Sequence, residues 1–145
     1  MSNIINNLNI FLSNLNVYYR KLQNYHWNIQ GMDFFEVHAK LEEFYNKINE
    51  QIDEVAEHIL IIGGQPLGSL KDYLDNTSLT EAPNSKIKSH EVFVSITNDL
   101  NLLLDQATGI KKEADEAQDY ITSTFMDDFI TDYSKILWML RHVVA

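Results

Sequence analysis

Residues 26–57 read HWNIQGMDFFEVHAKLEEFYNKINEQIDEVAE, and the fold can be built outward from this stretch. Apolar residues recur in steps of three and four on both sides of Gly31, which is the pattern of two amphipathic helices. Glycine tolerates the left-handed backbone that ends helices, so we expect a short turn at Gly31. A short turn makes the two helices antiparallel neighbours. The stretch therefore predicts a helical hairpin.

The helical pattern continues towards both ends of the chain. We expect long helices over about residues 2–28, 33–62, 89–112 and 115–144. Residues 63–88 contain both prolines and three of the five glycines, and we expect a crossover there with one short helix near 69–74. A long crossover allows the next helix to run parallel to the one before it. The predicted fold class is all-α, a four-helix bundle with one long crossover, as a single domain over residues 1–145.

The composition limits the classes of partner. The chain has 145 residues, a formal net charge of −10 and no cysteine. A chain of this length buries roughly two thirds of its unfolded surface and supports its own core. Binding to a nucleic-acid backbone needs a basic face, so the charge argues against DNA as the main partner. The lack of cysteine excludes disulfides, thiolate metal sites and cysteine nucleophiles.

The expected location is the cytoplasm. The opening residues MSNIINNLNIF have neither the basic segment nor the unbroken apolar segment of a signal peptide. The sequence has no run of about 18 apolar residues, so we expect no membrane span.

Two histidines flank the predicted turn. His26 lies five residues before Gly31 and His38 lies seven residues after it. In an antiparallel hairpin, both positions lie roughly 7–11 Å from the turn. The two imidazoles can therefore converge from neighbouring helices.

Two carboxylates follow further along the second helix. Asp53 and Glu57 have i, i+4 spacing, which places both side chains on one helical face. His38 and Asp53 are fifteen residues apart, about 22 Å along the helix axis. Metal–ligand bonds are about 2.0–2.2 Å long, so one copy of the chain cannot bring both ends to one ion.

A second copy of the chain resolves this separation. If the second helix packs antiparallel against its copy across a two-fold axis near residues 45–47, the histidines of one copy meet the carboxylates of the other. The two-fold symmetry then produces two such sites in each dimer. A ligand set of nitrogen and oxygen without sulfur suits iron, and also zinc, copper or manganese. The alternatives are histidines in the core and carboxylates in solvent, which is the common place for each residue type taken singly.

Several segments resemble the Dps proteins, the dodecameric mini-ferritins named for DNA protection in starved cells. These segments are HWNIQG at 26–31, the approach to His38, DEVAE at 53–57, GGQPLGSLKDYL at 63–74 and WMLR at 138–141. The resemblance covers essentially the whole chain. It implies a ferritin-like four-helix bundle whose crossover carries a short helix between the second and third long helices.

The resemblance also implies a ferroxidase centre shared between two subunits. His26 and His38 match the histidine ligands of one subunit, and Asp53 and Glu57 match the carboxylate ligands of the other. Glu42 stands where the family commonly has an aspartate ligand. The family oxidises iron(II), often with hydrogen peroxide and otherwise with dioxygen, and stores iron(III) mineral in a hollow shell. The implied metal is therefore iron, and the implied partner is the chain itself, in a dodecamer built from two-fold dimers.

Other positions refine this comparison. Trp27 matches a tryptophan close to the family's ferroxidase centre. His58 stands where many relatives have arginine, and we expect it to alter pairing at the interface. The Glu-x-x-His motif of true ferritins is absent, which favours the site between subunits. The lysine-rich N-terminal extension of DNA-binding relatives is also absent, so direct DNA binding is not expected.

An acidic group precedes the last predicted helix. Asp115, Glu116 and Asp119 lie about where relatives line a three-fold pore with carboxylates, and such rings attract cations. The alternative is a solvated helix start, because acidic residues favour the first turn.

Three functions stay open: an iron-oxidising storage shell, a DNA-protecting nucleoid-associated shell protein, and a structural oligomer with a vestigial site. The intact ligand positions argue against the third.

Overall fold

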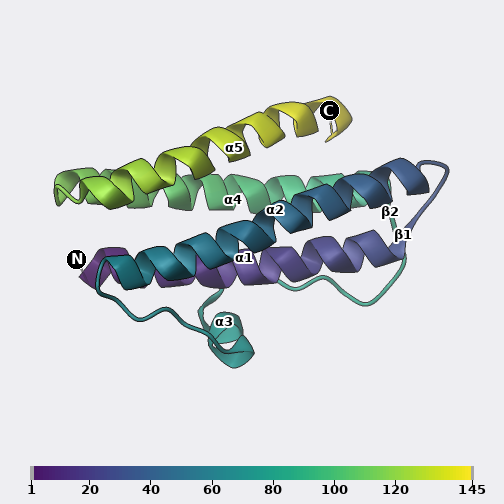
Figure 1. Cartoon of the computed structure of the whole chain (residues 1–145). Helices are drawn as coiled ribbons and strands as arrows, with labels where there is room; N and C mark the ends of the chain where they lie inside the picture. The colour runs from purple at the N-terminus through teal and green to yellow at the C-terminus, as the bar shows by residue number, and fades with distance from the viewer. Residues whose placement is uncertain (1, 145) are drawn as a thin grey trace.

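The computed structural model describes residues 2–144, and four long helices form its bundle. These are α1 (Ser2–Asn28), α2 (Phe34–Ile61), α4 (Ser89–Glu116) and α5 (Tyr120–Val144). α1 runs antiparallel to α2 and α4 runs antiparallel to α5, while α2 and α4 point the same way (Figure 1). The all-α, ferritin-like fold expected from the sequence is confirmed.

The apolar stripes of the helices meet in one core between them. Its largest fully buried side chains come from α1, α2, α4 and α5 and include Phe11, Leu15, Leu41, Ile59, Leu103 and Tyr133. The core therefore holds the four helices in fixed register, and this register positions every side chain discussed below.

The crossover returns the chain to the end of the bundle where α2 begins. Its short helix α3 (Leu70–Asn76) starts at Ser69, whose side chain accepts a hydrogen bond from the backbone N–H of Asp72 at 3.2 Å. Strands β1 (Ile29–Gln30) and β2 (Ile87–Lys88) then pair in parallel, with Ile29 beside Ile87. This pairing places the start of α4 beside the turn between α1 and α2. Gly31 occupies that turn with φ 141°, which agrees with its predicted role.

The start of the last helix differs from the prediction. Asp115 and Glu116 belong to the end of α4, and α5 begins only at Tyr120. Gln118, with φ 59°, breaks the two helices apart. Acidic residues suit a helix interior as well as a first turn, so the sequence pattern did not reveal this break.

The first turn of α5 buries polar rather than apolar side chains. The apolar Ile121 is 62% exposed, whereas Thr122 and Ser123 are buried. Both hydroxyl groups make hydrogen bonds to other elements, which is why polar residues occupy this part of the interior.

Among residues 2–144, no helix is long and apolar enough to cross a membrane.

Candidate metal centre

Two reciprocal hydrogen bonds join His26 and His38 across the α1–α2 hairpin, and we call this pair the histidine clasp. The Nδ1 atom of His26 lies 2.7 Å from the carbonyl oxygen of His38, and the Nδ1 atom of His38 lies 2.7 Å from the carbonyl oxygen of His26. A carbonyl oxygen only accepts, so each Nδ1 must carry the proton and donate. In a neutral ring the remaining lone pair is then on Nε2, the atom left available to a metal ion.

Ring packing fixes the orientation of the clasp. The two imidazoles stack with their centroids 3.6 Å apart and their planes at 10°. Phe34 also stacks on His38, with ring centroids 4.8 Å apart, and Tyr45 meets His26 in a T-shaped contact with centroids 5.3 Å apart. His26 is only 6% exposed. The two histidines were predicted to converge, and the structure brings them together with their Nε2 atoms free of hydrogen bonds within residues 2–144.

Glu42 lies beside the clasp, one helical turn after His38. Its Oε1 atom is 3.8 Å from Nε2 of His26, and the side chain is 54% exposed. This separation is too long for a hydrogen bond. It is short enough for both atoms to bind one ion, because two metal–ligand bonds of about 2.1 Å span up to about 4.2 Å. Glu42 is therefore a carboxylate of the same copy that could bind an ion together with His26.

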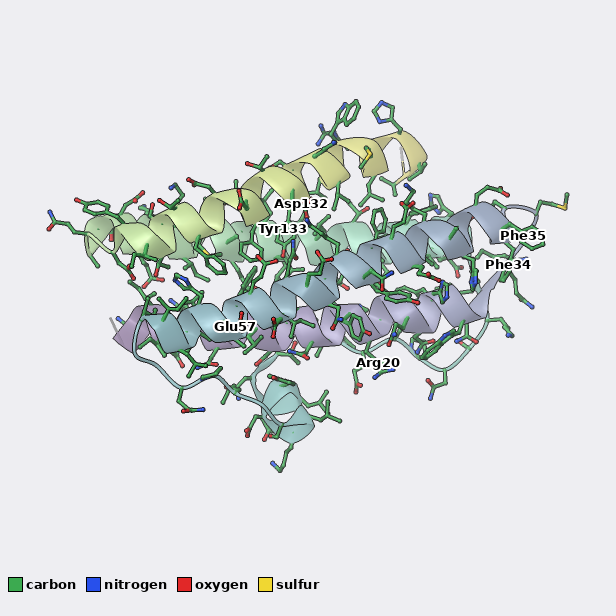
Figure 2. The ribbon with its side chains drawn as sticks, in the orientation of Figure 1. Arg20, Phe34, Phe35, Glu57, Asp132 and Tyr133 are labelled. Carbon is green, nitrogen blue, oxygen red and sulfur yellow. The ribbon has the colours of Figure 1, made fainter. Side chains whose placement is uncertain are left out.

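Asp53 and Glu57 lie away from the clasp, on the other half of α2. Both side chains are exposed, and neither has a hydrogen bond or ion pair within residues 2–144. Figure 2 shows Glu57 and Phe34 on opposite halves of this helix. Within the described part of the chain, no three histidine, aspartate or glutamate side chains gather around one point. One copy therefore presents two separate candidate half-sites: the clasp with Glu42, and the pair Asp53 and Glu57.

His58, which was expected to alter pairing at the interface, is not on the surface of the single copy. It is 3% exposed and lies inside the bundle, stacked on Phe125 with their ring centroids 4.2 Å apart. The hydroxyl of Thr122 donates to the Asp119 carboxylate at 2.6 Å, so Nε2 of His58 donates to Thr122 at 2.8 Å. Burial lowers the pKa of His58, and the charge of Asp119 partly opposes this. His58 is therefore a neutral core residue that ties α2 to α5.

The acidic residues at the α4–α5 junction are engaged in local bonds. Asp119 accepts hydrogen bonds from the backbone N–H and the hydroxyl of Thr122, as a helix cap does. Asp115 accepts a hydrogen bond from the hydroxyl of Ser123. These contacts support the capping interpretation of Asp119.

A second polar link crosses from α5 to α2 and was not expected from the sequence. The hydroxyl of Tyr133 donates to Oε1 of Gln51 at 2.8 Å, and Nε2 of Gln51 donates to Asp132 at 3.2 Å. Gln51 and Tyr133 are both buried. These residues are 82 positions apart, so no local pattern links them. Figure 2 shows Asp132 and Tyr133 on the middle part of α5.

Comparisons with known proteins agree with the fold. The sequence pattern of the Ferritin-like domain family matches residues 5–145. The "DNA protection during starvation protein" of Listeria monocytogenes is 36% identical over 112 residues, which cover 77% of this chain and 72% of that protein. The protein of the same name from Helicobacter pylori is 32% identical over 115 residues, 79% of this chain and 80% of that one.

A solved structure extends the similarity over nearly the whole chain. The crystal structure of a Dps protein from Vibrio cholerae O1 has a TM-score of 0.96 and 37% identity, and the match covers 99% of this chain and 90% of that one. That protein is described as a member of a broad superfamily of ferritin-like diiron-carboxylate proteins.

Proposed function

The chain belongs to the Dps proteins of the ferritin-like family, and from this premise we propose that it oxidises iron(II) at sites shared between two copies of itself. The iron(III) produced is stored as mineral in a hollow dodecameric shell. One observation carries the proposal: the histidine clasp, in which hydrogen bonds to backbone carbonyls leave both Nε2 atoms free. A metal-binding histidine usually donates the N–H of its other ring nitrogen to a carbonyl or carboxylate, and this hydrogen bond fixes the tautomer and the orientation of the ring.

The second half-site completes the ligand set in this proposal. Asp53 and Glu57 are exposed and unpaired within residues 2–144, which leaves both carboxylates available to another copy. A two-fold axis near the middle of α2 brings these carboxylates to the clasp and Glu42 of the partner subunit. Imidazole nitrogen and carboxylate oxygen together suit iron. The related Vibrio cholerae structure is described as a ferritin-like diiron-carboxylate protein, and this description also supports iron as the metal.

The chemistry requires little beyond binding and positioning. Iron(II) is the substrate, and hydrogen peroxide or dioxygen is the oxidant. Two iron(II) ions supply the two electrons that reduce one hydrogen peroxide to two waters, with two protons from solvent. The clasp and the carboxylates hold the ions and lower the cost of the higher charge on iron(III). The formal net charge of −10 favours the approach of cations.

Replacing His38 by asparagine tests this function. The asparagine amide can still donate to the carbonyl oxygen of His26, but it has no atom in place of Nε2. We expect His38→Asn to slow iron(III) formation about 10-fold or more after anaerobic iron(II) loading and addition of peroxide. His142→Asn is the matched control, since His142 is exposed on α5 and its Nδ1 also bonds a backbone carbonyl, that of Trp138, at 3.0 Å. A wild-type oxidation rate in His38→Asn of native mass would refute the assignment.

DNA protection is the second candidate function, and the names of the relatives favour it. The charge of −10 opposes direct contact with the DNA backbone. We expect no shift of linear DNA by the assembled protein in a gel at neutral pH and low salt. A shift that weakens with added salt would support the DNA-binding function instead.

A further inference from the structure

Two buried polar links join the second half of α2 to α5. Gln51 accepts a hydrogen bond from the hydroxyl of Tyr133 at 2.8 Å, and His58 donates one to the hydroxyl of Thr122 at 2.8 Å. All four side chains are at most 4% exposed. We call these two hydrogen bonds the α5 ties. A hydrogen bond depends on direction, whereas apolar contact does not, so the α5 ties fix the rotation of α2 about its axis.

The α5 ties flank the two exposed carboxylates of α2. Asp53 follows Gln51 by two residues, and Glu57 precedes His58 by one. At about 100° per residue, Gln51 and His58 lie within about 20° of each other around the helix axis, and the carboxylates lie about 130° from them. Glu57 and Tyr133 lie on neighbouring helices in Figure 2. The same turns of α2 therefore bind α5 on one side and present both carboxylates on another.

The rotation of α2 sets the direction in which the carboxylates leave the helix. Asp53 and Glu57 are exposed and have no hydrogen bond or ion pair within residues 2–144. Their oxygens lie about 5–6 Å from the helix axis, so a rotation of α2 by about 10° moves them by about 1 Å. Metal–ligand distances are held within about 0.2 Å, so this displacement is large for a ligand.

We propose that Gln51 and His58 are positioning residues that hold Asp53 and Glu57 in the direction required for metal binding. This inference rests on the proposed function, because it assumes that the two carboxylates are ligands. Neither positioning residue touches the ion. Their effect is on the affinity for iron(II) and not on the oxidation that follows, because the ligand atoms themselves are unchanged.

The test breaks the α5 ties from the α5 side, which leaves the sequence of α2 unchanged. Tyr133→Phe removes the hydroxyl that binds Gln51, and Thr122→Val removes the hydroxyl that binds His58. Thr122→Ser keeps that hydroxyl and is the conservative variant. Tyr18→Phe is the matched control, since the buried hydroxyl of Tyr18 donates at 3.0 Å to a backbone carbonyl oxygen of α4 and joins α1 to α4 instead.

The assay uses full-length assembled protein whose native mass has been measured. Each protein is loaded anaerobically with increasing iron(II), and the initial rate of iron(III) formation is measured after peroxide addition. These curves give the half-saturating iron(II) concentration and the rate at saturation. Urea unfolding gives the stability of each variant, and all rates are taken where every variant is folded. Anaerobic titration with cobalt(II), which accepts similar nitrogen and oxygen ligands, reports the geometry around the ion through its visible absorption.

We expect the half-saturating iron(II) concentration to rise about 3- to 10-fold in Tyr133→Phe and in Thr122→Val, with the rate at saturation within about two-fold of wild type. The cobalt(II) absorption bands should change in the same two variants. Thr122→Ser and Tyr18→Phe should match the wild-type protein in both measurements. If one of the two variants that break a tie fails to assemble, the other decides.

A wild-type half-saturating concentration in Tyr133→Phe and Thr122→Val would overturn the inference, even if both variants are less stable. An equal rise in Tyr18→Phe would also overturn it, because a general loosening of the bundle would then explain the effect. The proposed function fails separately if Asp53→Asn combined with Glu57→Gln keeps the wild-type half-saturating concentration and rate. In that case the carboxylates are not ligands, whichever effect the α5 ties have.

Discussion

Mixing two slowed variants should restore part of the iron oxidation if each site is shared between two copies. The first variant, His38→Asn, lacks a histidine ligand and keeps the carboxylates. The second, Asp53→Asn combined with Glu57→Gln, keeps the clasp and loses both carboxylates. Each variant alone contains only incomplete sites. A dimer with one copy of each variant contains one site with all ligands and one site that lacks His38 and both Asp53 and Glu57.

The expected recovery follows from the length of α2. His38 and Asp53 are fifteen residues apart within one unbroken helix, so their backbones are about 22 Å apart. No side-chain motion closes that distance, and a complete site requires two copies. Random pairing of equal amounts makes half of the dimers mixed, and half of the sites in these are complete. About one quarter of all sites should therefore be active.

The assay measures iron(III) absorbance after peroxide addition to anaerobically loaded protein. The two variants are unfolded together in urea at equal concentration, refolded by dilution, and compared with each variant refolded alone and with refolded wild-type protein. Native mass is measured for every sample, so that a failure to assemble is recognised. The initial rate of the mixture should approach one quarter of the wild-type rate.

A mixture no more active than the average of its two separate components would refute the shared site. In that case the ligands act within one copy, or Asp53 and Glu57 are not ligands at all. A mixture at the full wild-type rate would also contradict the reasoning, because random pairing leaves most sites incomplete.

Three further predictions concern the bundle that supports the site. Gly64→Ala places a methyl group 2.8 Å from Cγ2 of Ile5 and should lower the free energy of unfolding in urea by about 1–3 kcal/mol. Gly109→Ala meets no atom within 4 Å apart from its own helix backbone and chain neighbours, and it should raise that free energy by about 1 kcal/mol. Tyr133→Phe leaves the buried Oε1 of Gln51 without its donor and should cost about 1–3 kcal/mol, and an unchanged unfolding midpoint would contradict the buried link. Burial raises the pKa of Tyr133 well above 10.0, so its contribution to stability is complete below the unfolded value near pH 10 and falls as the pH rises further, by about 1.4 kcal/mol per pH unit. Urea unfolding at pH 9 to 11 should therefore show a steeper loss of stability in the wild-type protein than in Tyr133→Phe.

The sequence predicted the helices well where glycine or periodicity marked an end. The first helix was placed at 2–28 and the structure has Ser2–Asn28, and the turn at Gly31 follows from backbone freedom that only glycine has at φ 141°. The α4–α5 junction was missed because neither glycine nor proline stands there. The break depends on Gln118 in a left-handed conformation and on bonds from Asp115 and Asp119 to α5. Such bonds depend on how the helices pack and leave no local signal.

The same distinction separates the parts of the site. The convergence of His26 and His38 was predictable, because both lie close to one short turn and the helix rise fixes their heights. The inward position of His58 was not, because its partner Thr122 lies 64 residues away on another helix. The spacing of residues along α2 does not reveal which side chains of α5 pack against His58.

The two half-sites also differ in how firmly they are held. Backbone hydrogen bonds and stacked rings fix the clasp in a single copy, so the cost in conformational entropy of ordering these side chains is met on folding. Asp53 and Glu57 are exposed and have no such contacts within residues 2–144, so their ordering must be offset by metal binding or by contact with another copy. Under the proposed function, the clasp is therefore the preorganised part of the site. The carboxylates would be the part whose contribution depends on assembly, and iron binding would then be linked to association of the chains.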